Sequence, residues 1–249
     1  MLENKKFYGT TSTGQLPKME LNGNIIKGSS TEYSQEPLSE VIGSYVASKF
    51  LPVVRYFLDY ARNYSQVKWK GKYVSVCKKL DTPLLQFARA AEPLLGGKTK
   101  EIDILNIYSD LGLSKDYFVR LLIVDFIIGN TDRHWNNLDV TIKNGRYANV
   151  PLLDFGCSLL YNTSEYVLDI DVDLPVHYFP SKMINRDFTK AIPEIINYWK
   201  LKVDVPCPVF TADEFAELLP DEAVRECEYR VSKLVEFVNK RVSALRGLI

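Results

Sequence analysis

The strongest constraint on the fold is an apolar helical stretch that ends abruptly in a polar loop. Residues 115–128 have the apolar spacing of a helix. The sequence NTDRHWNN, residues 130–137, follows at once. Two expected strands, 138–143 and 147–153, come next and are joined by Asn-Gly, a dipeptide typical of tight turns. A helix end, a polar loop and a hairpin therefore follow one another within a short length of chain.

The remaining patterns divide the chain into two parts. The first part mixes strands, helix and hairpin, expected at 18–21, 24–27, 38–51 and 67–80. The second part is mostly helical, with segments at 82–91 and 102–111 and further helices from about 181 to the end. This predicts an α+β fold with a small N-terminal lobe, 1–80, and a helical C-terminal lobe, 81–249. A cleft between two such lobes is a common ligand site.

Composition excludes several classes of protein. The 249 residues are 46% hydrophobic and carry 31 basic and 31 acidic side chains, so a basic nucleic-acid-binding protein is not expected. The four cysteines form no C-x-x-C pair, and the chain has only two histidines, so a structural zinc site is not expected. The N-terminus lacks the apolar core of a Sec signal peptide, and the longest apolar stretch, Leu121–Ile128, is broken by Asp125, so we expect no membrane span. These features favour a reducing, cytoplasmic location.

Three polar residues around the loop suggest phosphoryl transfer. Asp132 and Asn137 lie five residues apart in the loop, and Asp154 of Leu153-Asp154-Phe155-Gly156 follows seventeen residues after Asn137. Phosphoryl transfer uses one carboxylate to orient the attacking hydroxyl, with a second carboxylate and an amide on Mg²⁺. Asp-x-x-x-x-Asn followed by Asp-Phe-Gly is the catalytic-loop and metal-loop pairing of protein kinases. The alternative is that Asp132 caps a turn and Asp154 is an ordinary turn residue.

The same residues resemble a known family, the HipA-like serine/threonine kinases. Asn130-Thr131-Asp132-Arg133-His134 resembles the catalytic loop of this family, in which the eukaryotic order His-Arg-Asp is reversed. Further likenesses lie in Thr13-Gly14-Gln15-Leu16-Pro17-Lys18, similar to the family's phosphate loop, in Ile25-Ile26-Lys27, and in the helix that carries Glu40. The resemblance implies a two-lobed protein-kinase-like fold, ATP and Mg²⁺ as cofactors, and a protein Ser or Thr as acceptor.

The resemblance also implies roles for individual residues. Asp132 is the expected catalytic residue, and Asn137 and Asp154 are the expected metal ligands. Lys27 is expected to bind phosphates and to pair with Glu40, with Glu36 as the competing partner. The other expected nucleotide-binding residues are Gly14, Gln15 and Lys18 in the phosphate loop and Cys77 near the hinge. A solvated Lys27 and a loop without phosphate contacts remain the alternatives.

Three hydroxyl residues in that loop, Thr11, Ser12 and Thr13, are candidates for autophosphorylation. In HipA toxins a serine of this loop is autophosphorylated, and Thr11 aligns with it. The alternative is that small polar residues simply suit a flexible loop. We expect no counterpart of the toxins' N-terminal subdomain, so the sequence resembles the compact members of the family, some of which are secreted bacterial effectors. Export by a non-Sec route is therefore an alternative location.

Two rival functions and several minor expectations accompany this interpretation. The rivals are a small-molecule or lipid phosphotransferase and a non-catalytic nucleotide-binding module, although an intact Asp132, Asn137 and Asp154 argue against the latter. His134 is expected to brace backbone rather than to act as a base. Asp169, Asp171 and Asp173 alternate as on a strand with a charged face, and Leu174 excludes an EF-hand loop.

Overall fold

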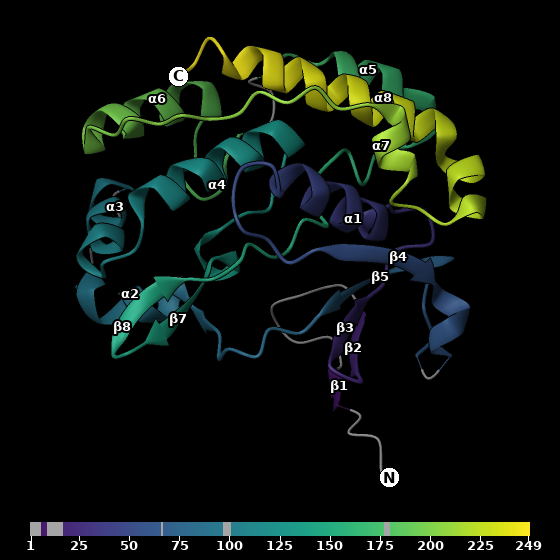
Figure 1. Cartoon of the computed structure of the whole chain (residues 1–249), viewed down its shortest axis with the longest axis horizontal. Helices are drawn as coiled ribbons and strands as arrows, with labels where there is room; N and C mark the ends of the chain where they lie inside the picture. Colours follow the sequence, from purple (N-terminus) through teal and green to yellow (C-terminus); the bar gives the residue numbers. More distant parts are fainter. Residues whose placement is uncertain (1–5, 9–16, 66, 97–100, 177–179) are drawn as a thin grey trace.

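A five-stranded antiparallel sheet forms the N-terminal part of the computed structural model, which describes residues 6–8, 17–65, 67–96, 101–176 and 180–249 (Figure 1). The strand order is β1-β2-β3-β5-β4. The strands are β1 (Lys6–Tyr8), β2 (Lys18–Leu21), β3 (Asn24–Lys27), β4 (Tyr56–Tyr60) and β5 (Tyr73–Lys78). The strands expected at 18–21 and 24–27 are confirmed, and Gly23 with a φ of 76° makes the tight turn between them.

The hairpin expected over 67–80 is wrong. Only β5 forms there, and its partners are β3 and the preceding strand β4. In β4, Tyr56 and Leu58 are buried and Phe57 is exposed, so this strand carries the alternation of a half-buried edge. Burial of β4 against the rest of the protein therefore decides the pairing of β5, and the alternation of Lys68 and Lys70 before Gly71 does not.

Helix α1 (Glu36–Ala47) covers one face of the sheet and separates it from the helical part (Figure 1). Pro37 occupies its first turn, where a missing N–H costs nothing. Val41, Ile42 and Val46 are fully buried, as their helical spacing predicts. The helix packs against β4, β5 and α4 (Lys115–Ile128), so it joins the two parts of the molecule.

The C-terminal part is mainly helical. A three-stranded antiparallel sheet, β6 (Leu85–Gln86), β7 (Asp139–Lys143) and β8 (Arg146–Asn149), lies at its edge. Its α-helices are α2 (Phe87–Leu95), α3 (Glu101–Asp110), α4, α5 (Leu168–Asp173), α6 (Phe188–Trp199), α7 (Ala212–Ala216) and α8 (Asp221–Leu245). Short 3-10 turns complete it: η1 (Ala61–Tyr64), η2 (Trp135–Asn137) and η3 (Glu165–Val167). An α+β fold with a sheet-rich N-terminal region and a helical remainder is confirmed.

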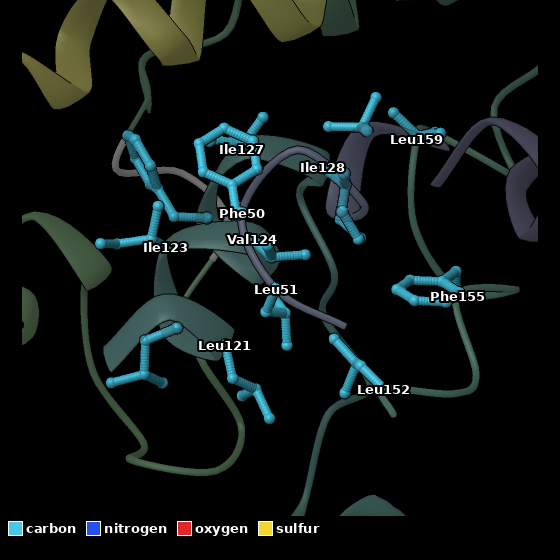
Figure 2. Packing of buried hydrophobic residues seen from close by; sticks show 14 of the residues in the cluster. Phe50, Leu51, Leu121, Ile123, Val124, Ile127, Ile128, Leu152, Phe155 and Leu159 are labelled. Carbon is cyan, nitrogen blue, oxygen red and sulfur yellow. The ribbon is translucent and has the colours of Figure 1, made fainter. Parts of the chain in front are cut away.

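Helix α4 is the centre of the core, and the expected span 115–128 is correct. Figure 2 shows its apolar side chains packed among residues from distant segments, which include Phe50, Leu51, Leu152, Phe155 and Leu159. Ser114 caps its N-terminus by accepting a hydrogen bond from the Tyr117 N–H, and Gly129 ends it in the left-handed conformation with a φ of 60°. The polar loop therefore leaves the core at a fixed point.

Residues 168–173 form a helix, so the strand expected around Asp169, Asp171 and Asp173 is wrong. Leu168 and Val172 are both buried, and a spacing of four residues places them on one face of a helix. Burial of this pair outweighs the alternation of the aspartates. In the described part of the chain, no helix combines the length and the apolar character needed to cross a bilayer.

A short parallel bridge connects the two parts close to the cleft. Val53 pairs with Leu152, and the Val54 N–H donates to the Leu152 carbonyl at 3.0 Å. The bridge fixes the start of the segment that carries Asp154 against the chain that follows α1. The division of the chain at residue 80 stays a prediction, and it falls in the segment between β5 and β6.

Candidate active site

Lys27 at the end of β3 lies between two carboxylates. Its Nζ is 2.6 Å from Oε1 of Glu40 and 3.0 Å from Oδ1 of Asp154. Although burial lowers it, Asp154 and Glu40 together hold the pKa of Lys27 well above its usual value. Glu36, the competing partner, instead accepts a hydrogen bond from the Ser30 hydroxyl. The structure thus pairs Lys27 with Glu40.

Glu40 also anchors the segment that carries Asp154. The Phe155 N–H donates to Oε2 of Glu40 at 2.8 Å, and Glu40 is fully buried. The Phe155 ring is buried against α1, where an added Cβ on Gly43 would lie 2.8 Å from the Cβ of Phe155. Gly43 therefore permits a close approach between α1 and the Asp154 segment, because any larger residue would push Phe155 away.

Asp154 faces the cleft with nearly half of its side chain exposed. Its φ of 67° is a left-handed conformation that is uncommon for a residue other than glycine. Lys27 lowers the pKa of Asp154 to about 2, so this carboxylate is ionised at neutral pH. An ionised carboxylate held in an unusual backbone conformation at a cleft is consistent with a binding role.

A buried ion pair supports the polar loop. Asp125 on α4 and Arg133 in the loop are each 1% exposed, and Nε of Arg133 lies 3.1 Å from Oδ2 of Asp125. The Arg133 guanidinium also donates to the carbonyls of Leu153, at 2.8 Å, and of Asn137, at 3.3 Å. Asn130 completes the support by donating to Asp125 at 3.0 Å. Arg133 therefore ties the loop to the segment that precedes Asp154.

The loop presents Asp132 and Asn137 to the same cleft. The Asp132 N–H donates to the side-chain oxygen of Asn130 at 3.0 Å, and the Asn137 side-chain amide donates to the Asp132 carbonyl at 3.1 Å. The Asp132 carboxylate accepts from Nζ of Lys182 at 2.6 Å. Lys182 lies fifty residues from Asp132 in a segment without a motif, so nothing in the sequence marks it as a site residue.

A cleft of about 1440 Å³ brings the expected residues together. It is lined by Lys18, Lys27, Cys77, Asp132, Asn137 and Asp154, among others. Burial raises the pKa of the Cys77 thiol. A cleft of this size is large enough for a nucleotide.

The structure does not describe every expected site residue. Gly14, Gln15, Thr11, Ser12 and Thr13 lie outside the described residues. His134 lines the cleft, and its buried Nδ1 has no hydrogen-bond partner among the described residues. The bracing of backbone expected of His134 is carried out by Arg133.

Asp139 at the start of β7 is a further residue that the sequence analysis missed. It lines the cleft, and burial together with the neighbouring Asp154 raises its pKa to about 6. Its place in the sequence could have indicated this position. Asp139 lies two residues beyond Asn137, at the start of an expected strand. Because side chains alternate along a strand, a residue this close to the loop can face the same cleft.

The residues present fit a Mg²⁺ ion bound together with phosphates. Asn137 and Asp154 supply the oxygen ligands that Mg²⁺ prefers, and both line the cleft beside Lys27. Within the described segments, no group of three or more His, Cys, Asp or Glu side chains is arranged to hold a metal ion. Mg²⁺ bound together with substrate phosphates uses only one or two protein groups, and Asn137 and Asp154 could supply these two.

Comparison with known proteins shows similarity at the level of structure. No protein-family model and no curated protein matches the sequence. The Helicobacter pylori proinflammatory kinase CtkA superposes with a TM-score of 0.61 and 17% identity, covering 97% of this chain and 96% of that one. HipA from Shewanella oneidensis MR-1, solved with HipB and operator DNA, superposes with a TM-score of 0.51 and 13% identity, covering 97% and 67%. The chain has the fold of HipA-like kinases.

Proposed function

We propose that this protein is an ATP- and Mg²⁺-dependent protein serine/threonine kinase. The observation that carries the proposal is the joint placement of Lys27, Glu40 and Asp154 in one bonded network, with Asp132 and Asn137 on the same cleft. This set supplies a cation for phosphates, two metal-binding groups and a carboxylate for the acceptor. The fold of kinase neighbours supports the same chemistry.

Each of these residues would have its own role in the transfer of the phosphoryl group. Lys27 would bind phosphate oxygens of ATP while Glu40 holds its side chain in place. Asn137 and Asp154 would hold Mg²⁺, which supplies positive charge to the phosphates when bound. Asp132 would orient the acceptor hydroxyl and accept its proton as the new O–P bond forms. The bond between the γ-phosphorus and the bridging oxygen breaks, and ADP leaves with that oxygen.

The acceptor in this proposal is a Ser or Thr hydroxyl of a protein. Support comes from the resemblance of the catalytic loop to HipA-like serine/threonine kinases, and one structural neighbour is itself described as a proinflammatory kinase. We place the protein in the bacterial cytoplasm, with export as an effector as the alternative. Autophosphorylation within Thr11–Thr13 belongs to the same proposal, because these hydroxyls lie in the expected phosphate loop, beside Gly14.

Transfer of labelled phosphate tests the proposal. The protein is incubated with γ-labelled ATP, Mg²⁺ and a bacterial lysate separated into protein and small-molecule pools. We expect label on Ser and Thr of proteins, loss of that label with Asp132→Asn, and normal labelling with Asp110→Asn, a matched change at an exposed residue of α3. Label found only in the small-molecule pool would refute a protein acceptor and indicate a small-molecule phosphotransferase. Peptide mass spectrometry of residues 10–13 shows whether the protein phosphorylates itself there.

A further inference from the structure

Lys182 is a surface lysine held at the carboxylate that the proposed function assigns to the acceptor. Its Nζ lies 2.6 Å from Oδ1 of Asp132, and the two side chains are 58% and 39% exposed. An exposed pair of this kind contributes about 0 to 1 kcal/mol to stability. The fold therefore gains little from the contact.

The backbone around Lys182 is fixed, which sets this residue apart from an ordinary surface lysine. Ser181 pairs with Arg186 in a short bridge, and the Ser181 N–H donates to the Arg186 carbonyl at 3.0 Å. The neighbours Ser181 and Met183 are 2% and 4% exposed. The Ser181 hydroxyl also accepts from the Ile184 N–H at 3.3 Å. A tight turn with a buried base thus presents Lys182 toward Asp132.

The catalytic loop itself offers little positive charge for a phosphoryl group. Within residues 130–137 the permanently charged cation is Arg133, which is 1% exposed and bonded to Asp125. Lys27, in turn, is bonded to Glu40 and Asp154. The transition state of phosphoryl transfer spreads negative charge over three oxygens and needs cations close to it. A lysine beside Asp132 meets that need at the acceptor end of the cleft.

We propose, building on the kinase function above, that Lys182 is a catalytic residue that contacts the phosphoryl group during transfer. An ammonium group has three N–H donors, and Asp132 takes one of them at Oδ1. The remaining donors bind oxygens of the transferring γ-phosphoryl group. The second oxygen of Asp132 receives the acceptor proton as the acceptor O–P bond forms and the bond to the ADP oxygen breaks. Lys182 gives up no proton and so keeps its charge throughout.

A transition-state analogue tests this role without an identified acceptor. Calorimetry measures the affinity for Mg-ADP alone and for Mg-ADP with aluminium fluoride, which mimics the transferring phosphoryl group. In the wild type the fluoride complex should bind more tightly. In Lys182→Ala the affinity for Mg-ADP should stay unchanged, while the gain from aluminium fluoride should fall by about 10- to 100-fold. Lys182→Arg should recover part of the gain, because it restores the charge.

The control and the rate measurement separate this inference from the proposed function. Lys190→Ala, at an exposed lysine of α6, should bind both ligands like the wild type. With a labelled protein acceptor, Lys182→Ala should lower kcat by about 10- to 100-fold and leave KM for ATP unchanged. A wild type that does not bind Mg-ADP would refute the kinase proposal. A wild type that gains affinity from aluminium fluoride, with an equal gain or a higher kcat in Lys182→Ala, would refute the role of Lys182 alone.

Discussion

Asp125→Asn tests whether the buried pair under the polar loop, residues 130–137, stabilises the fold as its geometry requires. The change keeps the size of the side chain but leaves the Arg133 guanidinium, 1% exposed, without its counter-charge. Breaking a buried pair from one side costs about 3 to 5 kcal/mol, because the remaining charge stays away from water. A domain has only about 5 to 15 kcal/mol of stability in total. We therefore expect Asp125→Asn to fold marginally.

Urea unfolding measures this loss against a matched control on the same helix. With a slope of roughly 2 to 3 kcal/mol per M, the midpoint of Asp125→Asn should fall by about 1 to 2.5 M. Asp116→Asn removes the carboxylate partner of Arg120, a pair four residues apart whose side chains are 49% and 22% exposed. That change should cost no more than about 1 kcal/mol, including its effect at the helix N-terminus. Equal midpoints for the two variants would refute the structural role of the buried pair.

Three further changes probe other parts of the site. Gly43→Ala should destabilise the fold by about 1 kcal/mol in urea unfolding and weaken ATP binding, because crowding against Phe155 outweighs the gain in helix propensity. A variant that is more stable than the wild type and binds ATP equally well would contradict the close packing of Gly43 against Phe155. Asp139 has a pKa raised to about 6, so the contribution of its protonated carboxyl to stability is present below about pH 4 and is lost as the pH rises through 6. Without Mg²⁺, Asp139→Asn should therefore become more stable than the wild type as the pH rises, by up to about 3 kcal/mol. A difference in unfolding free energy that stays constant from pH 5 to 8 would refute this. Lys72 of the sheet pairs with Glu222 and Glu226 on α8. Lys72→Ala should therefore speed amide hydrogen exchange at the start of α8, and high salt should do the same in the wild type. Unchanged exchange would show that these ion pairs do not hold α8 against the sheet.

The sequence predicted the elements whose patterns reflect their own burial. The helix 115–128 matched because its apolar residues, its Ser114 cap and its terminal Gly129 all agree. The strands on either side of Gly23 matched because the turn fixes their register. The strand expected before Gly71 and the strand expected around Asp169, Asp171 and Asp173 failed because alternating charged residues imitate a strand. The pairing of β5 is decided by β4, a separate segment whose Leu58 is buried. Residues 168–173 form a helix because Leu168 and Val172 are both buried on one face.

For the candidate site, spacing identified the residues that belong to motifs. Asp132, Asn137 and Asp154 lie on one cleft, as their order along the chain suggested. Lys182 and Asp139 belong to no motif, and only folding brings Lys182 to Asp132 and Asp139 to the cleft. The choice of Glu40 over Glu36 as the partner of Lys27 also depends on the packing of α1, since both carboxylates lie on that helix.

Calorimetry of ATP binding with Mg²⁺ and with EDTA tests most directly whether the Lys27 and Asp154 network binds ATP together with Mg²⁺. In the wild type, Mg²⁺ should strengthen the binding of ATP. In Asp154→Asn that gain should disappear, while binding in EDTA should be equal or tighter, because the change removes a negative charge beside the phosphates. An equal loss of affinity in both conditions, or a gain from Mg²⁺ that survives in Asp154→Asn, would contradict the assignment of this cleft as a Mg-ATP site.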